Sequence, residues 1–114
     1  MDDINKQLKK GVLEILILKL LTLRDMYGYQ LIQELDEASH GVFRMKEGSL
    51  YPVLYRLEDD QFIESYWEQV NDRRSVPRKY YRITARGRTE YKRALDELKR
   101  FITGIYAILD LGGK

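Results

Sequence analysis

The sequence predicts a mainly helical fold that contains one small β-hairpin and ends in a long helix. Three observations support this fold class. Apolar residues recur at helical spacing up to about residue 60, and again from residue 85 onward. Between these regions, the segments FIESYWEQV and RKYYRIT are rich in β-branched and aromatic residues, which are typical of strands. The chain has 114 residues, the length of about one domain.

The composition points to a soluble globular protein. Hydrophobic residues make up 44% and charged residues 33% of the chain, and there is no cysteine. The lack of cysteine excludes a disulfide framework and cysteine-ligated metal sites, and it is consistent with the cytoplasmic location that we expect. The longest apolar run, VLEILILKLLTL, is twelve residues long and includes Glu14 and Lys19. Because a membrane-spanning helix needs about 20 apolar residues, we expect a core helix here, with no signal peptide and no membrane partner.

Local signals set the boundaries of the expected helices. Leu31, Ile32 and Leu35 share one face of the second helix, and the segment Ser39-His40-Gly41 ends it. The expected elements are a helix from about residue 5 to 23, a break over 24–27, a helix over 28–38, a short extended connection over 42–45, a third helix from about 49 to 60, and a last helix over 85–111.

The third helix contains a proline that limits where the helix can begin. Leu50, Leu54 and Leu57 follow an i, i+4, i+7 spacing, which places them on one helical face. Pro52 lies within this pattern, and proline is tolerated in a helix only near its start. We therefore expect the helix to begin close to Ser49, acting as N-cap, or a residue or two earlier.

The connection between the two expected strands, NDRRSVP, is polar and leads into a cluster of bases. Arg73, Arg74, Arg78 and Lys79 fall within seven residues that contain no acid. A local cluster of this kind favours a polyanionic partner more than the modest net charge of +2 does. The sequence therefore predicts a hairpin with a basic tip.

The last expected helix, which Thr84 caps, carries an apolar seam at heptad-like spacing. This seam can pack back on the helix at residues 5–23, or it can pack against the same helix of a second copy. The first helix, with an apolar face that includes Leu16, can contribute to the second arrangement. We predict a homodimer, whose interface residues are Leu8, Val12, Ile15, Tyr91, Leu95, Leu98, Phe101, Ile102, Ile105 and Leu109.

The order helix, helix, short strand, helix, hairpin is typical of a winged helix-turn-helix domain. We expect such a domain at residues 1–84, followed by a C-terminal dimerisation helix at residues 85–114. In this fold the third helix enters the major groove of double-stranded DNA, and the hairpin, or wing, follows the backbone. The predicted DNA-binding residues are Lys46, Gly48, Ser49, Tyr51, Pro52, Tyr55, Arg56, Arg73, Arg74, Arg78 and Lys79.

The outward residues of the third helix suit DNA chemically. Gly48 and Ser49 let the backbone approach a phosphate at the helix N-terminus, where N–H groups are unpaired. A tyrosine hydroxyl can bind a phosphate oxygen, its ring can contact a thymine methyl, and Pro52 gives the exposed start a rigid apolar edge. We expect Tyr55 and Arg56 to contribute to base discrimination. In the alternative, the two tyrosines of this helix only pack on neighbouring surface.

Three segments, YGYQLIQEL, GSLYPVLYRLEDDQFIES and RKYYRITARG, occur in this order along the chain. Together they resemble the PadR family of bacterial transcriptional regulators over essentially the whole sequence. The resemblance implies a homodimeric repressor with the C-terminal helix as dimerisation arm, and the single short C-terminal helix is similar to the smaller branch of the family. In a two-fold dimer the DNA half-sites should form an inverted repeat.

The resemblance also implies a small aromatic or hydrophobic effector. Similar proteins often respond to aromatic acids or hydrophobic drugs, sometimes in a pocket between the C-terminal helices. The aromatic candidates in this sequence are Tyr91, Phe101 and Tyr106, which can either contact such a ligand or form plain interface core.

No residue pattern indicates an enzyme. Asp36, Glu37 and His40 lie within one turn and resemble part of a metal-binding site, but charged surface residues at the end of a helix are the better explanation for this grouping. We expect no catalytic residue, no metal and no cofactor. The alternative to a DNA-binding regulator is a winged-helix module that dimerises and binds protein without reading DNA, and the basic wing argues against it.

Overall fold

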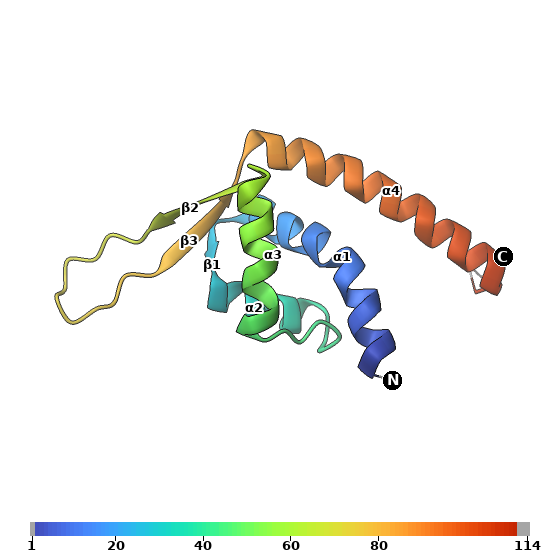
Figure 1. The fold of residues 1–114 in the computed structure, drawn as a ribbon, viewed down its shortest axis with the longest axis horizontal. Coiled ribbons are helices and arrows are strands. Elements are labelled where there is room, and N and C mark those ends of the chain that lie inside the picture. Colours follow the sequence, from blue (N-terminus) through green and yellow to red (C-terminus); the bar gives the residue numbers. More distant parts are fainter. Residues whose placement is uncertain (1, 112–114) are drawn as a thin grey trace.

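A computed structural model describes residues 2–111 of the chain, with the side chains of residue 9 and residues 11–111. It confirms the mainly helical fold with a small β-hairpin wing (Figure 1). The elements are α1 (Asp2–Leu23), β1 (Met26–Tyr27), α2 (Gly28–Ala38), α3 (Glu47–Asp59), β2 (Ile63–Trp67), β3 (Lys79–Ile83) and α4 (Ala85–Leu109).

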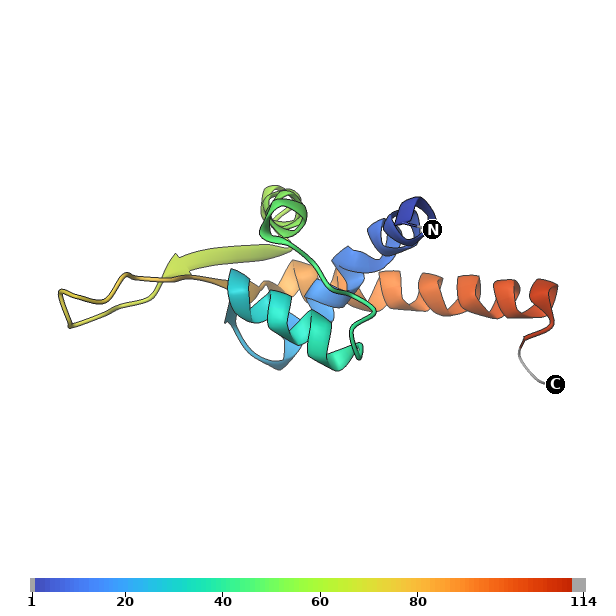
Figure 2. The same ribbon diagram turned by 90° about the horizontal axis from the view of Figure 1, so that it is seen from below.

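Two projections extend in opposite directions from a central head, which consists of α1, α2, α3 and the base of the sheet (Figures 1 and 2). The wing, which consists of β2, β3 and the connection between them, extends to one side, and α4 extends to the other. The molecule therefore measures 59 × 32 × 22 Å along its principal axes. Figure 2 shows α3 end-on, raised above the layer that contains the sheet and α4.

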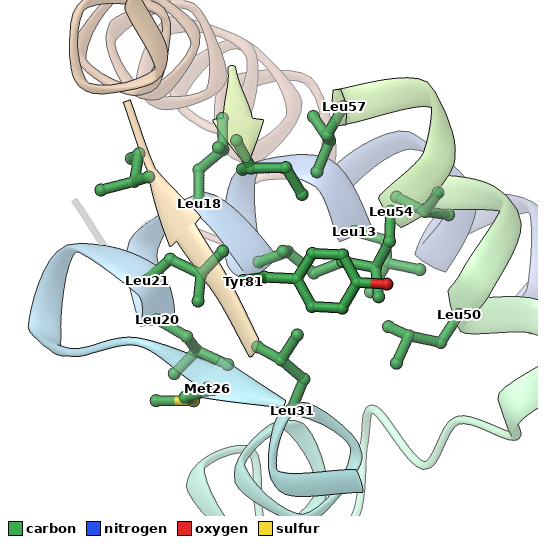
Figure 3. Close-up of a cluster of buried hydrophobic side chains, with 14 of the residues drawn as sticks. Leu13, Leu18, Leu20, Leu21, Met26, Leu31, Leu50, Leu54, Leu57 and Tyr81 are labelled. Atoms are coloured by element: carbon green, nitrogen blue, oxygen red, sulfur yellow. The ribbon is translucent and has the colours of Figure 1, made fainter. Parts of the chain in front are cut away.

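The core of the head lies where α1, α2, α3 and the sheet meet, and Tyr81 of β3 is at its centre (Figure 3). Leu50, Leu54 and Leu57 enter it from α3, as their spacing predicted, and Val53 joins them. The buried residues are Leu13, Ile17, Leu18, Leu20, Leu21, Met26, Leu31, Leu35, Leu50, Val53, Leu54, Leu57, Ile63, Tyr81 and Ile83.

Helix α3 begins at Glu47, because Lys46 adopts an extended conformation and its carbonyl accepts the N–H of Leu50 at 3.0 Å. Ser49 is therefore a first-turn residue and not the N-cap, and the start lies two residues before it. Pro52 falls inside the helix. The carbonyl of Gly48, which would otherwise accept a hydrogen bond from position 52, lies at an exposed residue, so water can hydrate it.

The expected extended connection at residues 42–45 is wrong, because this segment forms a turn and irregular structure. Ser39 accepts hydrogen bonds from the first two backbone N–H groups of this segment. The Ser39 carbonyl accepts from the Val42 N–H at 3.2 Å, and the Ser39 hydroxyl accepts from the Phe43 N–H at 2.8 Å. The third strand is β1, which lies in the expected break at residues 24–27. Two residues are too few to show a strand period.

The sheet has the strand order β1-β3-β2, with antiparallel pairing throughout. Successive side chains of a strand point to opposite faces, so the register assigns each residue to a side. Ile63, Tyr81 and Ile83 are buried on the inner face, which packs on the core. The row Tyr27, Tyr80, Tyr66 crosses the three strands on the outer face.

The junction between β3 and α4 is closely packed. The Thr84 hydroxyl accepts a hydrogen bond from the Gly87 N–H at 2.9 Å, which confirms Thr84 as the N-cap of α4. The same hydroxyl lies 2.7 Å from the carbonyl oxygen of Gln61, to which it donates. Gly87 is buried against the carbonyl of Phe62, with no room for a β-carbon. No helix within residues 2–111 combines the length and apolar character needed to cross a membrane.

Candidate nucleic-acid interface

The outward face of α3 carries Gly48, Pro52 and Tyr55, all exposed, directly opposite the leucines that hold the helix on the core. Lys46 and Ser49 are exposed at its N-terminal end. The first turn presents free backbone N–H groups beside a glycine that has open space around its Cα. This part of the helix can therefore approach a flat or grooved partner closely.

Tyr51 lies one turn before Tyr55 on α3, with the two ring centroids 6.1 Å apart, but it is turned more toward α2. It is half-buried, and its hydroxyl lies against Gly28 at the start of α2, where a β-carbon would collide with it. Burial raises the pKa of Tyr51, and the nearby carboxylate of Glu47 adds to this effect. The ring of Tyr51 therefore packs on neighbouring surface, as in the alternative to DNA contact, whereas Tyr55 remains 52% exposed.

Arg56 lies on the α1 side of α3. Its Nε donates to Oε2 of Glu14 at 2.7 Å, and both side chains are partly exposed. Sequence reasoning did not identify this pair, because its members are 42 positions apart in different helices. The guanidinium would have to leave Glu14 to reach a base, so Tyr55 is the better placed of the two residues that we expected to discriminate bases.

The tip of the wing carries two exposed arginines, Arg73 and Arg74. Asp72 shapes the turn beneath them, since its side chain accepts the N–H of Arg74 at 2.9 Å and its carbonyl accepts the N–H of Ser75 at 3.0 Å. In the part of the chain that the structure describes, neither guanidinium lies within ion-pair distance of a carboxylate. The predicted basic tip is thus open to an anionic partner.

Arg78 at the base of the wing is engaged within the protein. Its Nε and Nη2 donate to the two carboxylate oxygens of Glu68 at 3.0 and 2.9 Å, and its Nη1 donates to the Tyr27 hydroxyl at 3.1 Å. This pairing lowers the pKa of Glu68 and raises that of Arg78. Lys79, the fourth predicted base, is half-buried with Nζ 5.7 Å from the ring centroid of Tyr81.

An array of tyrosines and arginines covers the outer face of the sheet, and sequence reasoning did not identify it. We call Tyr27, Tyr66, Tyr80, Arg78 and Arg82 the tyrosine–arginine array. Ring centroids lie 5.3 Å apart for Tyr27–Tyr80 and 5.7 Å apart for Tyr66–Tyr80, with the guanidinium carbon of Arg78 4.5 Å from the Tyr27 centroid and that of Arg82 4.8 Å from the Tyr66 centroid. The alternation of Tyr80 with Arg78 and Arg82 at every second position is a signal that could have revealed it. Aromatic and cation–π contacts of this kind stabilise the base of the wing.

Helix α4 divides the predicted interface residues into two groups. Tyr91, Leu95 and Leu98 are half-buried, and this part of α4 packs back on α1. Phe101, Ile102, Ile105 and Leu109 are exposed, as is every residue from 99 to 111. The first half of the seam therefore packs back on α1, which is one of the two arrangements left open by the sequence, and the second half is uncovered within the described chain. Val12 and Ile15 are half-buried on α1, and the side chain of Leu8 lies outside the described residues.

The charged end of α2 is a set of surface groups. Oδ1 of Asp36 accepts from Nε of Arg44 at 3.3 Å, and His40 has a positive φ of 55° in the turn that follows the helix. Among the described residues, no three histidine, aspartate or glutamate side chains are grouped so that they could hold a metal ion.

Comparison with known proteins places this geometry in a family. The sequence model of the "Transcriptional regulator PadR-like family" matches residues 17–93, from the middle of α1 into α4. This chain belongs to the PadR-like family. The family consists of transcriptional regulators and not of enzymes, and the match covers most of the core of the head, α3 and the wing.

Individual relatives and solved structures agree with this chain over most of its length. "Uncharacterized protein X" of Lysinibacillus sphaericus is 39% identical over 102 residues, which cover 90% of this chain and 88% of that protein. "Transcriptional regulator Rv3488" of Mycobacterium tuberculosis is 36% identical over 102 residues, 87% of this chain and 90% of that protein. The crystal structure of a PadR family transcriptional regulator from Eggerthella lenta has a TM-score of 0.81 at 30% identity, and the match covers 97% of this chain and 93% of that one.

Proposed function

We propose that this PadR-like regulator is a homodimeric repressor that binds an inverted-repeat operator. The observation that carries the proposal is the outward face of α3: Gly48, Pro52 and Tyr55 are exposed while the opposite face holds the helix firmly on the core. Residues 1–84 would bind DNA and residues 85–114 would join two copies.

The charges of the head assign different tasks to α3 and the wing. Within α3, Glu47, Glu58 and Asp59 outnumber Arg56, which pairs with Glu14. Affinity for phosphates must therefore come from Lys46 and from the wing, chiefly Arg73, Arg74 and Lys79. On the outward face of α3, Pro52 is apolar and Tyr55 is phenolic, which suits contact with thymine methyl groups in the major groove, and the exposed Asp59 ends this face at the last turn.

The exposed apolar side chains on the distal half of α4 support assembly of two copies. Phe101, Ile102 and Ile105 lie on one side of a helix that has no covering element in its own chain among the described residues. Side chains at this spacing pack well against the same helix of a second copy. A small aromatic or hydrophobic effector would bind between the paired helices, where Phe101 and Tyr106 offer aromatic surface, and would release the operator by changing the angle between the heads.

The spacing of the half-sites tests the dimeric repressor. Genomic footprinting would identify the operator, and its half-site centres should lie about 34–36 Å apart or a multiple of one DNA turn. Insertion of half a turn between them should abolish tight binding in a fluorescence anisotropy assay, and insertion of a full turn should be better tolerated. Equal affinity for both altered operators would contradict binding by a rigid two-fold dimer.

A salt titration with random duplex DNA separates the proposal from the alternative of a protein-binding module. A DNA-binding head should show an affinity that falls steeply with salt concentration. Failure to bind any duplex at low salt would instead favour the protein-binding module.

A further inference from the structure

We propose that Trp67 is a DNA contact on the wing, placed between α3 and the basic tip. The inference rests on the proposed DNA-binding function and adds a residue that the sequence did not assign to it. Trp67 is the only tryptophan of the chain and is 63% exposed. Tryptophan is highly buried on average, so an indole this exposed is unusual.

The strand register places Trp67 on the face of the sheet that is turned toward α3. Ile63, Ser65 and Trp67 point to the same side of β2, because side chains alternate along a strand. Ile63 is buried in the core, and the Ser65 hydroxyl donates to Glu58 of α3 at 2.5 Å. Trp67 lies two residues beyond Ser65, roughly 6–7 Å farther along the strand, where it remains exposed.

The residues around Trp67 favour a polyanion as the partner that contacts it. Its cross-strand partner is Lys79, and the strand leads to Arg73 and Arg74 at the tip. The acidic neighbour Glu68 points to the opposite face, where it is paired with Arg78. Beyond Ser65, which is bonded to Glu58, the inner face of the wing is thus apolar and basic at Trp67 and Lys79, whereas Glu64 and Glu68 are paired with arginines on the outer face.

Continuity with α3 identifies the polyanion as duplex DNA. A duplex that contacts both the outward face of α3, at Tyr55, and the arginines of the wing tip has to pass the inner face of the wing, where Trp67 lies. The indole can pack on a sugar, and its N–H can donate to a phosphate oxygen. Such a contact adds affinity without adding charge.

Tryptophan fluorescence tests the contact directly, because all tryptophan emission comes from residue 67. Labelled random duplex DNA would report binding by anisotropy, and acrylamide quenching would report the accessibility of the indole. We expect DNA to protect Trp67 from acrylamide. Trp67→Ala should weaken binding about five- to tenfold, equivalent to about 1 to 1.4 kcal/mol, with an unchanged salt slope, whereas Lys79→Ala should lower the slope by about 1.

Two further variants keep the test decisive. Trp67→Phe retains an aromatic ring, so it should recover part of the affinity if Trp67→Ala has disturbed only the contact. Leu23→Ala, which alters a 60% exposed apolar side chain at the end of α1, should bind DNA as the unaltered protein does. Circular dichroism would confirm that each variant is folded.

The outcomes distinguish this inference from the proposed function. No anisotropy change for the unaltered protein would overturn both. Normal DNA binding with unchanged quenching and an unaffected Trp67→Ala variant would overturn the tryptophan contact alone. Protection of Trp67 that grows with protein concentration in the absence of DNA would assign the residue to a contact between copies and would also overturn the inference.

Discussion

At the scale of single residues, the Tyr81 hydroxyl is a buried polar group of the core that lacks a hydrogen-bond partner among the described residues. The side chain is 1% exposed, and the hydroxyl is directed toward α3 (Figure 3). A buried hydroxyl without a partner costs about 1–3 kcal/mol of desolvation. Replacement by phenylalanine removes that cost and keeps the ring, so Tyr81→Phe should match or exceed the unaltered protein in its urea midpoint.

The pH dependence of stability provides a second readout for Tyr81. Burial raises its pKa to about 12 from an ordinary value of 10, so the folded state holds the proton more tightly. The resulting stability is fully present below pH 10 and is lost as the pH rises from about 10 to about 12. Tyr81→Phe has no hydroxyl to titrate, so it should not lose this part of its stability. A protein and variant that lose stability equally over this range would contradict the assignment.

The wing arginines should differ in their effect on the salt dependence of DNA binding. Arg73→Ala and Arg74→Ala should each lower the slope of log K against log salt by about 1, because each removes a free cation. Arg78→Ala should weaken binding with a smaller change in slope, since Arg78 is bonded to Glu68 and Tyr27. Arg93→Ala, on α4, is the control. A drop of about 1 for Arg78→Ala as well would show that this guanidinium exchanges Glu68 for phosphate.

Side-chain partners mark the limit of prediction at this scale. The inward leucines of α3 and the Thr84 cap followed from local spacing and side-chain chemistry. The engagement of Arg56 and Arg78 did not, because their partners Glu14 and Glu68 are distant in the sequence and the pairing depends on how helices and strands pack. From charge alone, the four basic residues of the wing looked equivalent. The structure separates the exposed Arg73 and Arg74 from Arg78, which is bonded within the protein, and from Lys79, which is half-buried.

At the scale of elements, the junction at Gly87 fixes how α4 leaves the sheet. A β-carbon at this position would collide with the backbone carbonyl of Phe62. Gly87→Ala should therefore destabilise the protein by about 1–3 kcal/mol or more, despite the higher helix propensity of alanine. Thermal unfolding followed by circular dichroism would measure the change.

Gly48→Ala is the matched control for the junction. Gly48 also lies in a first helical turn, but nothing lies within 4 Å of a β-carbon placed there. This variant should be at least as stable as the unaltered protein. Because backbone entropy alone favours alanine, similar losses in both variants would contradict the contact with Phe62 as the cause of the loss at Gly87.

Long elements were predictable and short ones were not. The bounds of α2 were predicted to the residue, and the hairpin strands followed from their composition. The strand β1 escaped detection because its conformation depends on pairing with Tyr80 and Tyr81 far along the chain. The start of α3 depends on the extended backbone of Lys46, a residue with no strong capping preference.

At the scale of the whole molecule, the distal half of α4 should control assembly. Ile105→Asp places a charge in the exposed apolar seam, where burial in a dimer would cost several kcal/mol. Sedimentation at micromolar concentration should give about twice 13.6 kDa for the unaltered protein and a lower mass for the variant. Thr103→Asp, on the opposite side of the same helix, should leave the mass unchanged. A monomeric unaltered protein would remove the basis for an inverted-repeat operator.

The division of α4 into a covered and an uncovered half also bears on cooperativity. The head has its own core and can fold as one unit, whereas residues 99–109 of a single chain are held mainly by hydrogen bonds within the helix. Helical segments of this length are only marginally stable in water without packing. The end of the arm should therefore fray in an isolated chain and become ordered when copies meet, so that its local opening free energy, unlike that of the head, rises with protein concentration.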